Sequence, residues 1–277
     1  MNKEKTYYWP AWFSRLLPKT EQEKIKKILP KIQTTQILLW DALNIYDDFL
    51  DGEGKPEELP KANNYFRRYL ETYYQFNLTP DYYRLFNQIL NNLEKANLEE
   101  TKEPKLKIEN GLITIPKKLP DWKRTESLSA KSLALSLSSV ALLSFLGYKA
   151  TDKKVRATVD FFKYALAAKQ LADDSCDWLE DLKNSHLTIA NTPILKAAKR
   201  QNLRLDFNHQ PEILYLLFTQ ESSPIIIAEI ERLCLMARKK IKKINGRPNN
   251  ALLKNLILPL EKSCQKSKKF IQSIFES

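Results

Sequence analysis

The sequence predicts an all-α fold, a single large bundle of helices around a central apolar cavity. Five glycines among 277 residues amount to about 2%, against about 7% in average proteins, so tight turns and left-handed backbone positions are few. This scarcity argues against sandwiches, barrels and glycine-rich phosphate loops. Hydrophobic residues make up 43% of the chain, enough for a sizeable core, and the central stretches are too apolar for surface helices.

The first half of the chain predicts four helices. Thr20 suits the N-cap of the first, and Gly52 suits the end of the second. The fourth follows Thr79 and has Pro80 in its first turn, where proline is favoured. In order along the chain, the expected helices span residues 20–32, 33–51, 61–77 and 80–97.

The second half begins with an irregular segment. Residues 98–125 contain three prolines, many charges and the β-like run Leu-Ile-Thr-Ile-Pro, which predicts a long loop with a small hairpin. The stretch 126–147 is apolar on nearly all sides and is expected to be a buried helix. Further helices are expected at 151–184, 192–201, 210–219, 222–244 and 248–275. No repeat or linker divides the chain, so one domain over 1–277 is expected, with an aromatic segment at 1–19.

The charge of the chain favours anionic partners. Lysine and arginine number 45, aspartate and glutamate number 33, and the net charge is +12; such a surface attracts nucleic acid, acidic membranes or phosphorylated small molecules. Three widely spaced cysteines, Cys176, Cys234 and Cys264, fit a reducing compartment. Neither a signal-peptide pattern nor a run of 18 apolar residues occurs. A cytoplasmic location is therefore expected, with a peripheral membrane contact favoured by the aromatic first segment and the basic last helix.

Two short segments carry the most clearly patterned acidic residues. Seven of the thirteen aspartates lie in two segments, each of which contains one copy of Asp-Asp-x-x-Asp. They are Asp47, Asp48 and Asp51 in the first copy and Asp173, Asp174 and Asp177 in the second, which Asp181 follows. Residues four apart share a helix face, so like charges repel within each copy. Because their neighbours are apolar, the arrangement is destabilising without a cation.

Carboxylate oxygens are the ligands that Mg²⁺ prefers, and neither segment contains a histidine. The aspartates therefore predict a magnesium site. The expected metal ligands are Asp47, Asp48, Asp51, Asp173, Asp177 and Asp181.

With these motifs the chain resembles the trans-prenyltransferases, or polyprenyl synthases, of the class I isoprenoid synthases. Gln170 before the second copy matches the family's Gln-x-x-Asp-Asp-x-x-Asp. Lys131 and Ser132, ahead of the apolar stretch, are similar to its Lys-Thr helix, and the segment 181–188 resembles its Asp-Leu-x-x-Gly-Lys-x-Thr. The resemblance covers residues 35–190. It implies an all-α enzyme in which three Mg²⁺ ions hold an allylic diphosphate.

The resemblance also implies where the substrate binds. The catalytic set consists of Asp47, Asp48, Asp51, Asp173, Asp174 and Asp177. Contacts to the diphosphate are expected from Arg67, Arg68, Lys131, Ser132, Gln170 and Lys183. The carbocation requires a dry apolar cavity with π faces, for which the candidates are Trp40, Ala42, Leu43, Phe145 and Phe162. The family commonly forms homodimers.

Alternatives to chain elongation remain open at this point. No residue before Asp47 matches the Gly-Lys-x-x-Arg segment of the elongating enzymes, which binds isopentenyl diphosphate. Squalene and phytoene synthases, which condense two prenyl groups head to head, have a similar layout with Asp-x-x-x-Asp motifs. Terpene cyclases use a ligand triad with the spacing of Asp173, Asp177 and Asp181. A non-catalytic basic helical protein, which either binds a partner or associates with a membrane, is a further alternative. A nucleic-acid partner is disfavoured because its phosphates would have to avoid both acidic segments.

Overall fold

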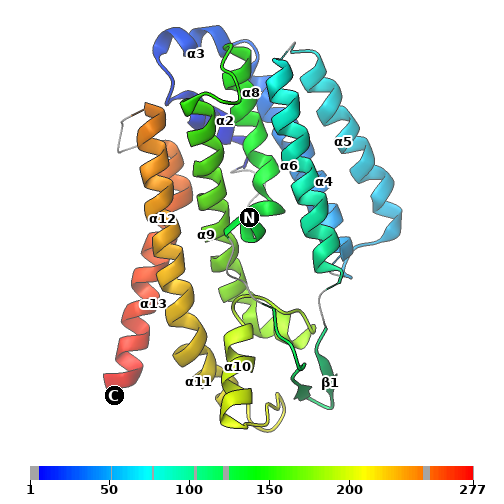
Figure 1. Cartoon of the computed structure of the whole chain (residues 1–277), viewed down its shortest axis with the longest axis vertical. Coiled ribbons are helices and arrows are strands. Elements are labelled where there is room, and N and C mark those ends of the chain that lie inside the picture. The colour runs from blue at the N-terminus through cyan, green and yellow to red at the C-terminus, as the bar shows by residue number, and fades with distance from the viewer. Residues whose placement is uncertain are drawn as a thin grey trace.

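The structure, a computed structural model, describes residues 6–50, 52–76, 78–102, 105–120, 125–245 and 250–276. Six long helices run roughly along a common axis (Figure 1). They are α4 (Leu29–Leu50), α5 (Leu59–Tyr74), α6 (Pro80–Glu100), α9 (Lys153–Lys183), α12 (Ser223–Asn245) and α13 (Leu258–Glu276). The expected all-α class is confirmed.

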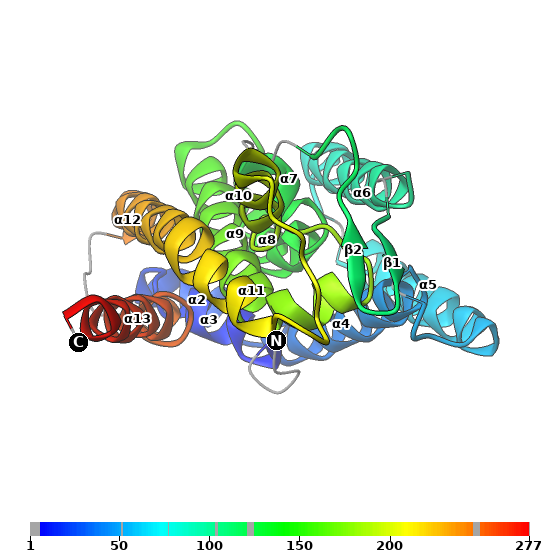
Figure 2. The same ribbon diagram turned by 90° about the horizontal axis from the view of Figure 1, so that it is seen from below.

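Shorter elements connect the long helices and close the two ends of the bundle (Figures 1 and 2). The short α-helices are α2 (Trp9–Ser14), α3 (Lys19–Ile25), α7 (Thr125–Ala130), α8 (Leu137–Phe145), α10 (Thr192–Gln201) and α11 (Pro211–Leu217). The 3-10 and π-helical turns are η1 (Pro56–Glu58), η2 (Leu133–Ser136), η3 (Phe218–Ser222) and η4 (Leu253–Ile257). The strands β1 (Lys107–Glu109) and β2 (Leu112–Thr114) pair in antiparallel register.

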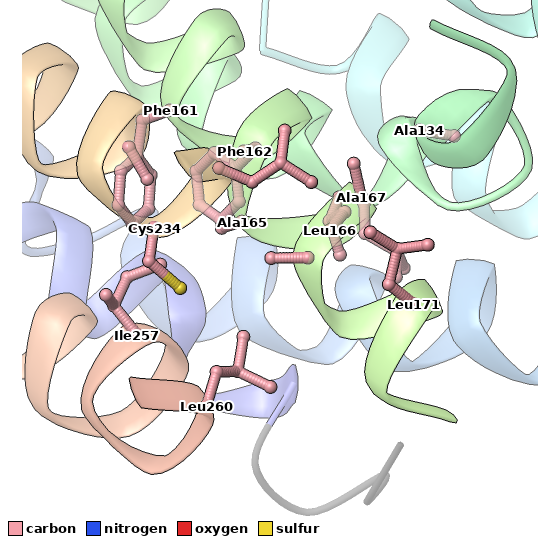
Figure 3. Packing of buried hydrophobic residues seen from close by; sticks show 14 of the residues in the cluster. Ala134, Phe161, Phe162, Ala165, Leu166, Ala167, Leu171, Cys234, Ile257 and Leu260 are labelled. Atoms are coloured by element: carbon pink, nitrogen blue, oxygen red, sulfur yellow. The ribbon is translucent and has the colours of Figure 1, made fainter. Parts of the chain in front are cut away.

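Helix α9 is the central element of the bundle. It packs along α12 on one side and against α7 on another, and its buried residues fall on more than one face. Figure 3 shows Phe161 and Phe162 of α9 packed near Cys234 of α12 and Ile257 and Leu260 at the start of the C-terminal helix. A helix enclosed in this way needs apolar residues on most sides, which explains why its sequence has no simple amphipathic stripe.

The aromatic first segment belongs to this core. Trp9 and Phe13 in α2 are 1% and 0% exposed, and the Trp9 ring stacks on Phe162 with 5.5 Å between ring centroids. The burial of these rings removes the aromatic argument for a membrane contact at this segment. Only Tyr8, with 49% exposure, faces outward to a large extent among the large rings described there.

The predicted boundary between the first two helices, at residues 32 and 33, is wrong. The sequence predicts one helix from Thr20 to residue 32, whereas α3 ends at Ile25 and α4 begins at Leu29. Thr20 is not the N-cap, because α3 begins at Lys19 directly after Pro18. Pro30 is the signal that marks the true start: proline is favoured in the first turn of a helix and disfavoured in its interior.

The apolar stretch expected to be one buried helix is broken into α7, η2 and α8. Carbonyl groups released at such a break need new partners when they are buried. The Gln36 Nε2 atom of α4 donates to the Leu135 carbonyl at 3.0 Å, and the Ser138 hydroxyl donates to Gln36 Oε1. The Tyr73 hydroxyl lies 2.9 Å from the Ser138 hydroxyl. A buried polar network therefore joins α4, α5 and the broken helix.

Removing the centre of this network is expected to destabilise the fold. Gln36→Leu leaves a buried carbonyl and a buried hydroxyl without their partner, which costs about 2 kcal/mol of unfolding free energy. Urea unfolding followed by circular dichroism measures the change. The exposed Gln88 of α6 supplies the control: Gln88→Leu is expected to shift the free energy by less than about 0.5 kcal/mol. Equal effects of the two substitutions would show that the network is energetically unimportant.

The predicted hairpin is present within the long loop. Asn110 and Gly111 at its turn have φ angles of 51° and 86°, the positive values that two-residue hairpin turns require. The hairpin docks onto the segment before α11, where the Ile113 amide donates to the Leu205 carbonyl at 3.0 Å and the Phe207 amide donates to the Gly111 carbonyl at 2.9 Å. Two loops that are distant in sequence thus close the lower end of the bundle in Figure 1.

One helical stretch is long and apolar enough to cross a membrane by length and composition. It runs from Pro211 to Ile244 through α11, η3 and α12, and 39% of its most apolar window is buried inside the bundle. No spanning helix is expected from the sequence, because charged residues interrupt the stretch. A helix that packs into a protein core has the same composition, and α12 packs along α9.

Candidate functional site

The first aspartate motif lies at the C-terminal end of α4, before the turn that leads to α5. Asp47 and Asp48 are exposed there, while Asp51 lies outside the described residues. The Asp48 carbonyl accepts hydrogen bonds from the amides of Glu53 at 2.9 Å and Gly54 at 2.7 Å. A Cβ atom at Gly54 would lie 2.6 Å from the backbone nitrogen of Phe49, so only glycine lets the loop fold back over this helix end.

The second motif lies on the C-terminal half of α9, and one of its aspartates faces inward. Leu171, Asp174, Trp178 and Leu182 follow each other at intervals of three or four residues and are all buried. Asp174 thus occupies one position of an otherwise apolar stripe. The Gln170 Nε2 atom donates to Asp174 Oδ1 at 2.7 Å, which partly compensates for the lost hydration of the carboxylate.

Lys131 connects the two motifs. It follows α7, which packs against α9, and its Nζ atom donates to Asp47 Oδ1 of α4 at 3.0 Å. The positive charge of Lys131 also acts on the Asp174 carboxylate, whose pKa it lowers. The Lys131 side chain is 28% exposed and that of Asp47 is 51% exposed, so this contact lies at the edge of the bundle. The motifs on α4 and α9 therefore share one cationic neighbour.

Burial dominates the electrostatics of Asp174. Desolvation raises the pKa of its carboxyl to about 7, the Gln170 hydrogen bond lowers it, and the charges of Asp181 and Asp173 raise it. Lys131 makes the smallest contribution, which is to lower it. A carboxyl group whose pKa is raised in this way is common at functional sites, where a charged ligand completes the arrangement.

The outer aspartates of α9 are differently placed. Both oxygens of Asp173 accept hydrogen bonds of 2.7 Å from Lys169, one turn earlier. Asp177 is exposed, and Asp181 is half-buried. The carboxylates of Asp173, Asp177 and Asp181 therefore have different surroundings: the first is paired with a lysine, the second is solvated and the third is half-buried.

The donor chemistry of the site fits Mg²⁺, although the carboxylates are not assembled around one point. In the part of the chain that the structure describes, no three His, Cys, Asp or Glu side chains form a cluster that could hold a metal ion. The aspartates of both motifs supply carboxylate oxygens, the ligand type of hard divalent cations. In the structure, lysine ammonium groups pair with Asp47 and Asp173.

The other predicted phosphate ligands lie on the surface or away from the aspartates. Arg67 and Arg68 are exposed on α5, and Arg67 lies 3.9 Å from Glu71 on the same helix. Lys183 is exposed at the end of α9, with its Nζ atom 6.0 Å from the centroid of the Phe207 ring. Of this group, Lys131 and Gln170 hydrogen-bond to the aspartates, and Ser132 follows Lys131 in the chain.

The predicted cavity residues do not line a described cavity. Phe162 is fully buried against Trp9, and Phe145 is 39% exposed at the C-terminal end of α8. Trp40 and Ala42 are buried in the core, and Leu43 packs at its edge. A cavity of about 170 Å³ lies elsewhere, between α5 and α6, and is lined by Leu70, Tyr73, Tyr74, Tyr83, Phe86 and Asn87.

Two further groups of residues support the second motif. Lys169 pairs with Asp173, and its position four residues earlier is a signal that the sequence contains. The Trp178 ring, next to Asp177, stacks on Phe218 with 4.5 Å between centroids and meets the Tyr215 ring edge-on at 5.4 Å. Phe218 begins the π-helical turn η3, and no sequence pattern indicates that this turn and α9 meet.

Comparison with known proteins identifies the fold. A solved structure of a geranylgeranyl pyrophosphate synthetase from the archaeon Geoglobus acetivorans superimposes with a TM-score of 0.61, covering 96% of this chain and 85% of that chain at 14% sequence identity. No family model and no curated protein matches the sequence. At this identity the likeness establishes architecture alone. The chain has the all-α fold of the isoprenoid synthases.

Proposed function

We propose that this protein is a Mg²⁺-dependent isoprenoid synthase that binds and ionises an allylic prenyl diphosphate, releases pyrophosphate and transfers the prenyl group. The observation that carries the proposal is the position of Lys131 between two aspartate motifs from separate helices. A structural or solvated acidic face does not require two such motifs at the same end of a bundle. The likeness to the fold of a prenyl diphosphate synthase supports the same function.

Different residues of the chain would serve different parts of such a reaction. Bound at the carboxylates of Asp47, Asp48, Asp173, Asp177 and Asp181, Mg²⁺ would supply Lewis-acid stabilisation of the departing pyrophosphate. The bond between the allylic carbon and its oxygen breaks, and the electron pair leaves with the diphosphate.

Three side chains of the site have roles that do not require a metal contact. The Lys131 ammonium group is positioned to hydrogen-bond to diphosphate oxygens on which negative charge develops. Gln170 holds Asp174 in place through its 2.7 Å hydrogen bond. The Lys131 charge also favours the ionised form of the buried Asp174 carboxyl, because it lowers the pKa that burial raises.

A second reaction of the same site is cyclisation or head-to-head condensation of prenyl groups. The observation that favours it is the spacing of the α9 carboxylates, since Asp173, Asp177 and Asp181 repeat at four-residue intervals. Both reactions begin with ionisation of an allylic diphosphate, so they share Lys131 and the aspartates and differ in the acceptor of the carbocation.

Pyrophosphate release by the purified protein tests the proposal. Geranyl, farnesyl and geranylgeranyl diphosphates are supplied with Mg²⁺, with and without isopentenyl diphosphate, and the products are extracted. Release that requires isopentenyl diphosphate indicates prenyl transfer; hydrocarbons or alcohols from the allylic substrate alone indicate the second reaction. Absence of Mg²⁺-dependent release from all of these substrates would contradict both.

Single aspartate variants connect the turnover to the motifs. Asp47→Ala and Asp173→Ala are each expected to lower kcat/KM by at least about a hundredfold, because each removes a charged group that stabilises the transition state. Asp81→Ala is the control, since Asp81 lies on α6 and pairs with Arg84. Its kcat/KM is expected to remain within about twofold of the wild type. Equal losses in all three variants would indicate a general loss of folded protein, which circular dichroism detects.

A further inference from the structure

The outer face of α13 carries lysines that pair with no acidic side chain in the described part of the chain. Lys262, Lys266 and Lys269 recur at intervals of four and three residues, on the side of the helix opposite Leu260 and Cys264. All three are exposed, and none has an ion-pair partner among the described side chains. We call these three lysines, with Phe270 and Ile274, the α13 outer face; the net charge of +12 adds to its positive potential.

Exposed apolar groups flank the lysines at the C-terminal end of the same helix. Phe270 is 66% exposed and Ile274 is 41% exposed, one turn apart. The exposure of large apolar side chains to water is energetically unfavourable. Clustered beside lysines, they are typical of a surface that meets another phase or molecule.

The inner side of α13 packs against the bundle and forms ion pairs with α12. Leu260 and Cys264 are buried against the bundle, Arg238 of α12 makes two hydrogen bonds of 2.6 Å to Glu261, and Lys268 lies 2.6 Å from Glu231. These contacts fix the rotation of the helix about its axis. The α13 outer face therefore points away from the bundle, along the edge seen in Figures 1 and 2.

A second exposed apolar pair lies at the same end of the molecule. Tyr215 and Leu216 of α11 are 52% and 50% exposed, and α11 and the C-terminal end of α13 both lie at the lower end of the bundle (Figure 1). Tyr215 also contacts Trp178 beside the second aspartate motif. The exposed apolar groups of this end thus reach from α13 towards the candidate site.

We propose that the α13 outer face binds an anionic lipid surface. Lysines at an interface attract acidic headgroups, and their alkyl chains extend along the membrane boundary while Phe270 and Ile274 enter the acyl region. A second copy of this chain fits less well, because it would bring an equally cationic face against the first. The proposal concerns a surface outside the carboxylate site and does not depend on the catalytic function.

Vesicle binding tests the proposal. The full chain is mixed with phosphatidylcholine vesicles that contain or lack phosphatidylserine, and the bound fraction is measured by sedimentation. Binding is expected only to the vesicles with phosphatidylserine. The combined variant Lys262→Gln, Lys266→Gln and Lys269→Gln is expected to weaken binding roughly a hundredfold, and Phe270→Ser is expected to weaken it about tenfold.

A charge-matched variant separates this face from the overall charge. Lys19, Lys24 and Lys27 are exposed near α3, at the opposite end of the bundle, and their replacement with glutamine removes the same charge. This control is expected to weaken vesicle binding by no more than about threefold. Equal weakening by both triple variants, no binding of the wild type, or a change of oligomeric state in Phe270→Ser with unaltered vesicle binding would each overturn the proposal.

Discussion

Asp174→Asn is expected to raise the stability of the protein at about pH 8 while leaving it nearly unchanged at about pH 4. Burial raises the pKa of Asp174 to about 7 in the folded protein, against about 4 for an aspartate in an unfolded chain. Between these values the folded state binds the proton and the unfolded state does not. The contribution of this group to the free energy of unfolding therefore falls as the pH rises through this window.

The expected size of this effect follows from the same shift. A change of about three pKa units corresponds to at most about 4 kcal/mol, and asparagine, which is neutral at every pH, does not incur this cost. Its side-chain oxygen can still accept the hydrogen bond from Gln170. Thermal unfolding of wild type and variant across this pH range measures the difference.

Asp173→Asn provides the matched control for this prediction. Asp173 is adjacent in sequence, but its side chain is 44% exposed and paired with Lys169, so a small change in stability is expected at any pH. A stability difference for Asp174→Asn that does not grow as the pH rises would contradict the burial of a destabilised carboxylate. The same result in both variants would attribute the effect to the total charge of the motif.

Lys131→Met is expected to remove most of the catalytic turnover. If Lys131 binds the diphosphate oxygens as proposed, its loss removes one charged donor aimed at the leaving group. Such a loss typically costs a hundredfold to a thousandfold in rate, or about 3 to 4 kcal/mol of transition-state stabilisation. Pyrophosphate release under saturating and limiting substrate separates the effect on kcat from the effect on KM.

A binding measurement distinguishes the role of Lys131 from damage to the site. Removal of its ammonium group also removes a cation that competes for Asp47, so thermal stabilisation of Lys131→Met by Mg²⁺ is expected to equal or exceed that of the wild type. Lys268→Met is the matched control, because Lys268 of α13 pairs with Glu231 of α12 and neither residue belongs to the site. Unchanged kcat/KM in Lys131→Met, or an equal loss in Lys268→Met, would assign the turnover to other groups.

Much of the architecture could be predicted from local sequence signals. Gly52 and Pro80 mark helix ends through backbone preferences that act within a few residues, and Asn110 with Gly111 suits the tight turn of the hairpin. The break between α7 and α8 could not be predicted in this way. It depends on Gln36, a side chain almost one hundred residues away in sequence, which supplies the buried hydrogen bond to the freed Leu135 carbonyl.

The candidate site shows the same division between local and long-range information. Local spacing indicated the two aspartate motifs, and the resemblance to the isoprenoid synthases indicated Lys131 and Gln170. The apolar stripe of Leu171, Trp178 and Leu182 contains the signal that Asp174 faces inward. Spacing alone favoured the face of α9 that carries Asp173, Asp177 and Asp181. Helical periodicity shows which residues share a face, but it does not show which face points into the bundle.

The sequence by itself determined the helical class and the pattern of carboxylates from which a metal site is predicted. Only the tertiary structure decided that α7 brings Lys131 to Asp47, that Asp174 is desolvated while Asp177 is solvated, and that Phe162 packs on Trp9 in the core. The physical reason is the distance along the chain over which each interaction acts. Propensity, capping and charge spacing act within about one or two helical turns, whereas burial and the approach of distant charges depend on how whole helices pack.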